Sequence, residues 1–276
     1  MTANLPRISI IIPSFNQGKY IEEAIQSVLQ QDYPELELVV VDGGSRDNSL
    51  QILQQYNSKI NYWVSEPDRG QSHAINKGFQ RCTGEIITFL SSDDKYFPGT
   101  FSDLHSLWPQ IKNYGAVVGA FKFMDENSTI QEVTIAPHLG EPAPLDLSLG
   151  PPGIYRLHQV ATFYTRLALD QIGRNVREEL QYVMDRELLY RVCGSFPIYL
   201  TERPYGVFRK HPFSKSSNEI LAFANEFAGL YQSSISGDSN KDRLRRRMAR
   251  YRKASGYLKY ANATGERREV VKALFK

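Results

Sequence analysis

The first hundred residues alternate between short apolar runs and stretches in which apolar residues recur at helical spacing. The run Ile8–Pro13 is rich in β-branched residues and ends at proline, which is typical of a buried strand. From Ile21 to Leu29 the apolar residues recur every three or four positions, which predicts a helix with one apolar face, and Asn16 is a candidate cap before it. The alternation continues, with strands expected over 36–41, 60–64 and 85–90, and helices expected after Ser45 or Asp47, over 71–79 and over 98–108.

Strands that are joined by helices and are almost continuously apolar predict a parallel sheet covered by helices on both faces. Ligands of such sheets bind at the carboxyl ends of the strands. Polar clusters follow three of the expected strands, at Ser14-Phe15-Asn16, Asp42-Gly43-Gly44 and Asp93-Asp94. We therefore expect a binding site at that edge of the sheet.

The second half of the chain is less regular. Residues 116–124 and 129–135 are expected to be strands, and the proline- and glycine-rich stretch 136–153 is expected to be a long loop that covers a site. Helices are expected over 165–172 and 180–192. A polar stretch and then a helical tail follow Pro212.

Composition narrows the class of protein. The 276 residues are 41% hydrophobic and 23% charged, which suits one large or two small soluble domains and argues against intrinsic disorder. No apolar run approaches the ~18 residues that cross a bilayer, and no signal peptide is visible. Cys82 and Cys193 are far apart, so we expect two separate thiols in a reducing compartment rather than a disulfide framework or a zinc site.

The net charge of +3 is unevenly distributed. Residues 241–276 hold 13 of the 33 basic residues and 3 of the 30 acidic ones, a balance of +10, which leaves 20 and 27 elsewhere, a balance of −7. The apolar residues Leu244, Met248, Tyr251 and Leu258 add a stripe to the basic tail. This pattern fits a helix on an anionic membrane surface, and it fits equally a helix that packs on the acidic body. A charge run alone is weak evidence for nucleic acid, and no nucleic-acid partner is expected.

The adjacent carboxylates of Asp93 and Asp94 repel each other unless a cation or ligand lies between them. Oxygen ligands after a strand suit Mg²⁺ or Mn²⁺ shared with a diphosphate, although a solvated turn is the alternative. Asp42 is placed to bind a nucleoside ring or ribose, and the alternative is a turn or helix-cap residue. The chain has neither the glycine fingerprint of dinucleotide-binding folds nor a P-loop.

Five short segments stand in order and at ordinary spacing in the first half. They are Ile10-Ile11-Ile12-Pro13-Ser14-Phe15-Asn16, Val39-Val40-Val41-Asp42-Gly43-Gly44-Ser45-Arg46-Asp47, Asp68-Arg69-Gly70-Gln71-Ser72 with Ala74-Ile75-Asn76-Lys77-Gly78-Phe79, Thr83-Gly84-Glu85-Ile86-Ile87, and Leu90-Ser91-Ser92-Asp93-Asp94. Together they resemble the nucleotide-sugar half of family-2 glycosyltransferases with the GT-A fold. The resemblance is strong over about 7–110 and weaker to about 215, through 159–164, 184–188 and 208–212.

The resemblance implies an α/β protein of the GT-A, nucleotide-diphospho-sugar transferase fold, with a mostly parallel central sheet flanked by helices. A glycosyltransferase domain is expected over 1–215, with a donor half (1–110) and an acceptor half (111–215), and a basic helical tail is expected over 216–276.

The resemblance also implies roles for single residues in binding the nucleotide-sugar donor. Pro13 and Phe15 would line the base pocket, with Asn16 beside them, and Phe15 stands where the family often has tyrosine. Asp42 would bind the base or ribose. The remaining donor-binding residues would lie near the nucleotide or sugar: Asp68, Arg69, Gly70, Ser92 and Asp93.

Ser92-Asp93-Asp94 stands where the family has its D-x-D motif, but its first carboxylate is missing. The resemblance assigns the Mg²⁺ or Mn²⁺ ion to Asp94, with His211 as a candidate second ligand. Asp185 matches the acidic position of the general base, which a poorly nucleophilic sugar hydroxyl needs. Glu187 is the main rival for that role, and the alternative for Asp185 is a surface carboxylate that pairs with Arg186 or caps a helix.

These observations predict an inverting, metal-dependent enzyme that transfers one sugar to a saccharide or lipid-linked saccharide in cell-surface glycan synthesis. The Q-x-x-R-W motif and membrane helices of processive family members are absent, which favours single transfer. A cytoplasmic location is expected, at the inner face of the membrane if the tail binds lipid. A sugar-nucleotide nucleotidyltransferase and a non-catalytic nucleotide-sugar binding protein are the alternatives.

Overall fold

The computed structural model describes residues 5–137, 157–212, 214, 222 and 226. Its first half alternates strands and helices as the hydrophobic pattern predicts. The strands are β1 (Ile8–Ser14), β2 (Leu36–Asp42), β3 (Tyr62–Ser65) and β4 (Ile86–Phe89), and the helices between them are α1 (Ile21–Leu29), α2 (Ser49–Gln55) and α3 (Gln71–Phe79). All neighbouring pairs among these four strands are parallel, so the predicted parallel sheet is confirmed for this half.

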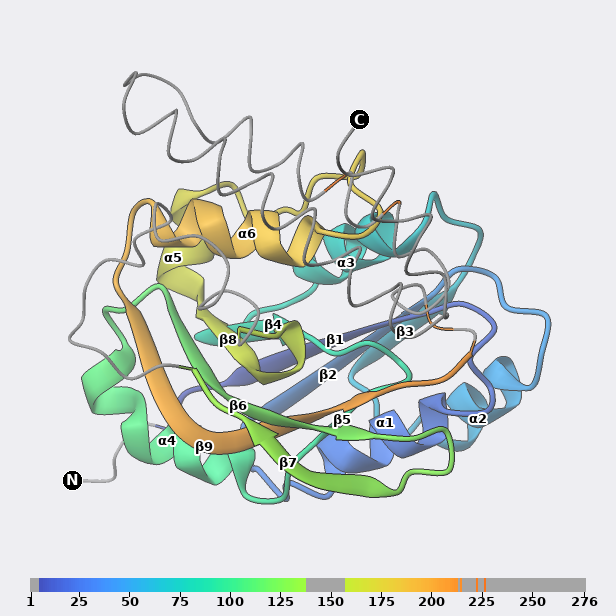
Figure 1. Ribbon diagram of the computed structural model, residues 1–276. Coiled ribbons are helices and arrows are strands. Elements are labelled where there is room, and N and C mark those ends of the chain that lie inside the picture. The colour runs from blue at the N-terminus through green and yellow to red at the C-terminus, as the bar shows by residue number, and fades with distance from the viewer. Residues whose placement is uncertain (1–4, 138–156, 213, 215–221, 223–225, 227–276) are drawn as a thin grey trace, which may run out of the picture.

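The second half extends the same sheet in mixed directions. Its elements are β5 (Lys95–Tyr96), α4 (Thr100–Ile111), β6 (Ala116–Met124), β7 (Ile130–Ile135), a 3₁₀ turn η3 (Gln159–Ala161), β8 (Thr162–Thr165), α5 (Arg166–Gln171), α6 (Met184–Cys193) and β9 (Ile198–Arg209). The described strands form one nine-stranded sheet in the order β3-β2-β1-β4-β8-β6-β9-β5, with β7 beside β6 (Figure 1). Strand β8 runs antiparallel to both β4 and β6, so the sheet is less parallel than the sequence suggested.

Helices cover both faces of the sheet because successive residues of a strand point to opposite sides. Ile10 and Ile12 belong to the apolar layer beneath α1, α2 and α4, whereas Ile11 belongs to the layer beneath α3, α5 and α6. Figure 1 shows these two groups of helices on opposite sides of the sheet. All three isoleucines are fully buried, and burying one such side chain stabilises the fold by about 1.5–3 kcal/mol.

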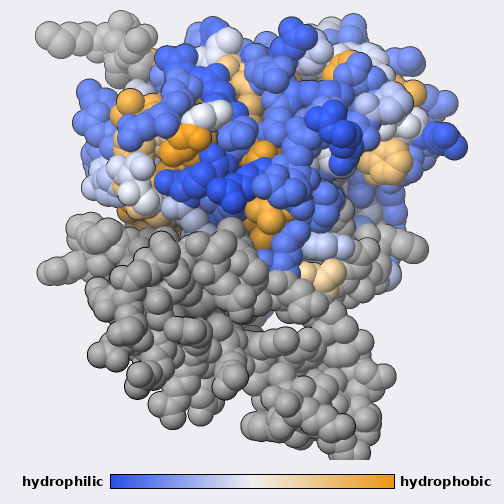
Figure 2. Space-filling model, turned by 90° about the horizontal axis from the view of Figure 1, so that it is seen from above, coloured by the Kyte–Doolittle hydropathy of each residue, from blue (hydrophilic) through white to orange (hydrophobic). Residues whose placement is uncertain are grey.

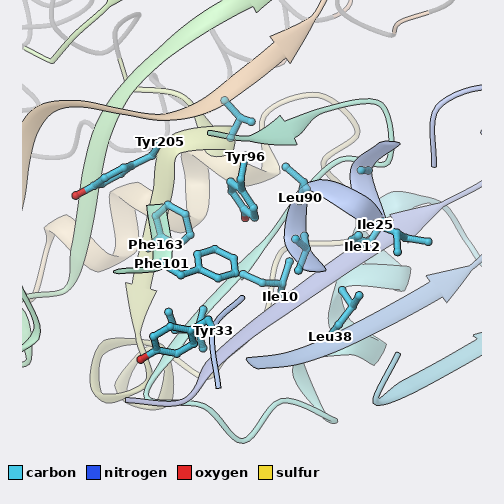
Figure 3. Packing of buried hydrophobic residues seen from close by; sticks show 14 of the residues in the cluster. Ile10, Ile12, Ile25, Tyr33, Leu38, Leu90, Tyr96, Phe101, Phe163 and Tyr205 are labelled. Carbon is cyan, nitrogen blue, oxygen red and sulfur yellow. The ribbon is translucent and has the colours of Figure 1, made fainter. Parts of the chain in front are cut away.

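An aromatic cluster joins the two halves of the chain (Figure 3). Phe101 of α4 makes edge contacts with Tyr33, Tyr96 and Phe163, at ring-centroid distances of 6.2, 5.4 and 6.4 Å. Phe163 also contacts Tyr205 of β9 at 5.7 Å. Aromatic pairs with this geometry add about 0.5–1.5 kcal/mol each beyond their buried area, so the later strands are packed firmly against the first half.

Several local predictions were wrong. Asn16 does not cap α1, whose N-cap residue is Tyr20. The helix expected over 180–192 begins only at Met184. Strands β8 and β9 were not expected. Apart from residues 222 and 226, the tail over 216–276 lies outside the described residues, as does nearly all of the loop 136–153.

Figure 2 shows the side that carries α3 and α6, where the described residues are mostly hydrophilic and the hydrophobic areas between them are small. In the described part of the chain, no helix is long and apolar enough to cross a membrane.

Candidate active site

The loops that follow β1 and β2 are joined by hydrogen bonds at the carboxyl edge of the sheet. The N–H of Gly43 donates to the carbonyl of Ser14 at 2.8 Å, and the N–H of Asn16 donates to Ser45 Oγ at 2.7 Å. Asn16 Oδ1 in turn accepts from the N–H of Arg46 at 2.9 Å. Asn16 adopts a left-handed conformation (φ 52°), which asparagine tolerates better than most residues. These bonds join the two loops into one surface, formed by residues 13–16 and 42–46 and called the ledge below.

Asp42 is fully buried and organises this ledge. Its Oδ2 accepts from the N–H groups of Gly44 (3.1 Å) and Ser45 (2.8 Å) and from Ser65 Oγ (2.6 Å), and its Oδ1 accepts from Ser45 Oγ. Gly44 has a φ of 81°, which suits glycine at this tight turn. The contact of Asp42 with a base or ribose stays a prediction, and in the structure its carboxylate fixes the loop.

Phe15 is the apolar residue that the ledge presents to solvent. Its side chain is 58% exposed, whereas Pro13 is buried. An exposed aromatic face at a strand end is a suitable stacking surface for a nucleobase. Of the two residues predicted for the base pocket, Phe15 therefore has the accessible surface.

The predicted donor residues Asp68, Arg69 and Gly70 lead into α3. Asp68 Oδ1 accepts from the N–H of Gly70 at 2.8 Å, and Gly70 has a φ of 111° that other residues rarely adopt. Asp68 also lies close to the ledge, since a Cβ on Gly43 would be 2.7 Å from Asp68 Oδ2. Arg69 pairs with Glu178 at 2.6 Å, and this hydrogen bond lowers the pKa of Glu178. Arg69 thereby links this loop to the segment before α6.

Ser92, Asp93 and Asp94 follow β4, with Ser92 and Asp94 buried and Asp93 half-buried. Asp94 Oδ1 accepts from the N–H of Arg209 at 2.8 Å, and burial together with the neighbouring charge of Asp93 raises the pKa of Asp94 well above its usual value. His211 lies 3.0 Å from Asp93, measured from Nε2 to Oδ2. The sequence placed His211 with Asp94, but the structure pairs it with the adjacent carboxylate.

Arg209 holds this carboxylate pair, and the sequence reasoning assigned it no role. Its side chain is almost completely buried, and its Nε donates to the carbonyl of Asp93 at 2.7 Å. The guanidinium also donates to Ser128 Oγ at 2.8 Å and pairs with Glu23. The available signal was its position two residues before His211, in a segment that resembles the family.

Asp185 is the second residue of α6 and lines a small pocket. Burial raises the pKa of its carboxyl group, and the adjacent Arg186 opposes that change. The pocket borders the end of β4, because Gln159 donates from Nε2 to the carbonyl of Phe89 at 2.7 Å. The lining residues are Leu157, His158, Gln159, Thr162, Tyr164, Asp185, Arg186, Leu189 and Tyr190.

Glu187, the rival base, is bound elsewhere. Its buried carboxylate pairs with Arg177 and Arg191 at 2.9 Å each. These two partners neutralise the charge and hold the carboxylate away from the lining of the Asp185 pocket. The geometry therefore favours Asp185 over Glu187 as the acid that meets a ligand.

His158 lies in the Asp185 pocket between two aromatic rings, at ring-centroid distances of 4.7 Å from Phe121 and 4.5 Å from Phe208. Burial and the charge of Arg186 lower the pKa of His158 to about 3. The imidazole is therefore neutral near pH 7 and adds no charge to the pocket.

The residues at the end of β4 fit a divalent cation that is shared with a ligand. Asp93, Asp94 and His211 supply carboxylate oxygens and an imidazole nitrogen, and His211 Nδ1 is buried without a hydrogen-bond partner. In the described ranges, no three His, Cys, Asp or Glu side chains form a complete metal cluster. A cation held there needs further ligands from a bound molecule, as Mg²⁺ commonly does with substrate phosphates.

The sequence matches a known protein family. The profile of the family described as "Glycosyl transferase family 2" matches residues 9–173. The Campylobacter jejuni protein named GalNAc(5)-diNAcBac-PP-undecaprenol beta-1,3-glucosyltransferase is 25% identical over 99% of this chain and 88% of its own length.

Two solved structures share the architecture. S. aureus TarS 1-349 in complex with UDP-GlcNAc superimposes with a TM-score of 0.66 at 21% identity, over 86% of this chain and 70% of that one. The mannosyltransferase PcManGT from Pyrobaculum calidifontis, in complex with GDP-Man and Mn²⁺, gives a TM-score of 0.64 at 17% identity over 98% and 75%. The chain spans 42% of a longer TarS structure. At these identities the likeness establishes the fold, and the predicted GT-A fold is confirmed.

Proposed function

Because the chain belongs to glycosyl transferase family 2, we propose that it transfers one sugar from a nucleotide-diphosphate sugar to an acceptor hydroxyl with inversion at the anomeric carbon. The observation that carries this proposal is Asp185, a carboxylate with a raised pKa that lines a pocket beside the end of β4. Donor-binding and acceptor-activating groups would then share one edge of the sheet.

Asp185 acts as the general base. As the acceptor oxygen bonds to the anomeric carbon, its proton moves to the Asp185 carboxylate, and the bond from that carbon to the donor phosphate breaks with its electron pair on the phosphate. The attack comes from the face opposite the leaving group, which inverts the configuration. Because desolvation raises its pKa, the Asp185 carboxylate is a stronger base than an exposed aspartate.

The ledge after β1 and β2 binds the donor nucleotide. Phe15 stacks on the base beside Pro13 and Asn16, and the loop held by Asp42 closes on the nucleoside. The other donor-binding residues surround the ribose and sugar: Asp68, Arg69, Gly70, Ser92 and Asp93.

Asp94 and His211 would hold Mg²⁺ or Mn²⁺, with Asp93 beside them. When bound, the ion would neutralise the donor diphosphate and make it a better leaving group. The carboxylate–imidazole donor set supports this assignment. One structural relative, PcManGT, was solved with GDP-Man and Mn²⁺.

We further propose that the acceptor is a saccharide or lipid-linked saccharide in cell-surface glycan synthesis. The Campylobacter relative, whose name includes an undecaprenol-linked glycan, supports this choice. Under this proposal residues 1–215 form the catalytic domain, and the basic tail over 216–276 brings the enzyme to the inner face of the membrane. The family match favours a transferase over a nucleotidyltransferase or a non-catalytic binding protein.

The replacement of Asp185 by asparagine tests the proposed base. D185N should transfer sugar at least about 10³-fold more slowly than the wild type, because the amide cannot accept the proton. Its affinity for the donor should change less than about twofold, since Asp185 lies outside the donor ledge. Transfer rates from a panel of UDP-, GDP- and TDP-sugars, with calorimetry of donor binding, measure both quantities. Normal turnover by D185N would exclude Asp185 as the base.

The metal assignment has its own test in Asp94→Asn. With Mn²⁺ present, the variant should bind the donor at least about tenfold more weakly than the wild type, because one ligand of the shared ion is lost. Without Mn²⁺, the two proteins should bind the donor with similar affinity. If calorimetry gives equal affinities in the presence of the metal, Asp94 does not hold it.

A further inference from the structure

The carboxylate of Glu226 binds the backbone at the start of α6. Glu226 Oε1 accepts from the N–H of Gln181 at 2.8 Å, and its Oε2 accepts from the N–H groups of Tyr182 and Val183 at 2.6 and 3.0 Å. Three successive backbone donors thus converge on one side chain. The family profile ends at residue 173, so Glu226 lies outside the part of the chain that the profile recognises.

This contact supplies what the local sequence lacks. The N-cap residue of α6 is Val183, which offers no side-chain acceptor to the first turn. The free N–H groups at a helix start favour a negative charge, and hydrogen bonds to a carboxylate are stronger than those to a neutral group. Of the three donors only the N–H of the N-cap residue Val183 belongs to the helix start, so Glu226 fixes the turn that leads into α6 and places its negative charge beside the first turn.

Helix α3 binds the beginning of the segment 176–183, which leads into α6. Asn76 makes two hydrogen bonds to the backbone of Val176, accepting from its N–H at 2.8 Å and donating to its carbonyl at 3.0 Å. Ser72 Oγ donates to the carbonyl of Leu180 at 3.0 Å. The segment 176–183 is thereby fixed to α3 at its beginning and to Glu226 at its end, and Asp185 follows two residues later.

We propose that Glu226 is a positioning residue for Asp185, which sets the start of α6 and thereby the place of the catalytic carboxylate. This inference rests on the proposed role of Asp185 as the base.

The charges around Asp185 agree with this arrangement. Arg186 on α6 lowers the pKa of Asp185, and the negative charge of Glu226 raises it. His158 and Tyr164 are neutral because burial shifts their pKa values, Tyr190 is a phenol, and Glu187 is paired with arginines.

Amide hydrogen exchange tests the contact itself, whatever the reaction proves to be. In Glu226→Gln and Glu226→Ala, the amides of residues 181–183 should exchange at least about tenfold faster than in the wild type. Glu179→Gln, which removes an exposed carboxylate from the same segment, should leave them unchanged. Unchanged protection in both Glu226 variants would overturn the inference.

Kinetics then test positioning. The kcat of Glu226→Gln should fall about 10- to 100-fold, because a small displacement of the base disrupts its alignment, whereas the KM for the donor should stay within about twofold. The acid limb of the kcat profile should move to lower pH, since a negative charge near Asp185 is lost. The proposal is contradicted if kcat falls at every pH without a shift of the acid limb, or if kcat equals that of the wild type.

The two proposals can fail separately. If D185N retains activity, Asp185 is not the base. If D185N is inactive and the Glu226 variants have normal activity, only the positioning role of Glu226 is refuted.

Discussion

The side chain of Arg209 carries a positive charge into the interior with 1% of its surface exposed. A buried cation is tolerated where it is paired and its N–H groups have acceptors. Arg209 meets this condition through Glu23, Ser128 and two backbone carbonyls, and its guanidinium lies 4.7 Å from the ring centroid of Tyr20. The residue therefore connects α1, the turn before β7 and the carboxylates after β4.

Replacing Glu23 by glutamine tests how much the ion pair between Glu23 and Arg209 stabilises the fold. Burial alone raises the pKa of Glu23, but hydrogen bonds from Lys95 and Ser128 and the charge of Arg209 outweigh it and lower the pKa below 4.5. The stabilisation is thus present above the unfolded-state pKa and is lost as the pH falls through the folded-state value. E23Q should be less stable than the wild type by about 1–2 kcal/mol at pH 7, less than for a fully buried pair because Glu23 is partly exposed.

Urea unfolding of E23Q and the wild type at several pH values measures this difference. The gap in the free energy of unfolding should narrow below pH 4.5. A gap that stays constant from pH 7 to pH 3 would show that the charge of Glu23 is not the cause. Glu22→Gln, on the exposed side of the same helix, is the matched control.

The contacts of single residues were hard to predict where their partners are distant in sequence. The sequence left Asp185 and Glu187 as rivals. Arg191 lies four residues after Glu187 on the helix, a spacing at which ion pairs form, but the second partner, Arg177, appears only in the folded chain. The contact of Asp42 with a base or ribose stays a prediction, and its hydrogen bonds to Ser45 and to the more distant Ser65 were not predicted.

At the scale of elements, the packing of α3 on β1 depends on one glycine. A Cβ on Gly78 would lie 2.4 Å from Ile11 Cγ2 and 2.9 Å from Ile11 Cγ1. Ile11 is fully buried beneath the helix, so it has little room to move. The absence of a side chain at Gly78 is what allows this close contact between helix and sheet.

Gly78→Ala should therefore destabilise the protein by about 1–3 kcal/mol through overpacking, although alanine is the better helix former. Gly194→Ala is the matched control, since a Cβ there would meet its nearest atom at 3.4 Å. The control should be neutral or slightly stabilising. Thermal unfolding of the two variants gives the comparison, and equal midpoints would contradict the packing argument.

The elements of the first half could be predicted because each strand is a continuous apolar run that a helix follows. Strands β8 and β9 could not, for different reasons. Strand β8 has four residues and pairs with two strands distant in sequence, and β9 is interrupted by Pro204 and by the exposed Glu202 and Arg203. Long-range pairing and partial exposure remove the periodic signal on which sequence reasoning depends.

At the scale of the whole molecule, charge separates the body from the tail. The residues up to 240 have a balance of −7, and residues 241–276 have a balance of +10. The negative charge of the body repels both a donor diphosphate and an anionic membrane. The proposed cation would reduce the repulsion of the diphosphate, and the basic tail would attract the protein to the membrane. Residues 241–276 lie outside the described residues.

Vesicle sedimentation measures whether the tail binds lipid. At low salt the full chain should pellet with vesicles that contain anionic lipid and remain in solution with neutral ones, because each basic residue near an anionic surface contributes about 1 kcal/mol. Binding should fall steeply above about 0.5 M salt, where charges are screened beyond ~4 Å. Removal of residues 241–276 should abolish binding, while transfer to a water-soluble acceptor continues. Failure of the full chain to bind anionic vesicles at any salt concentration would leave the acidic body as the partner of the tail, and the enzyme would then reach a lipid-linked acceptor without electrostatic attraction to its membrane.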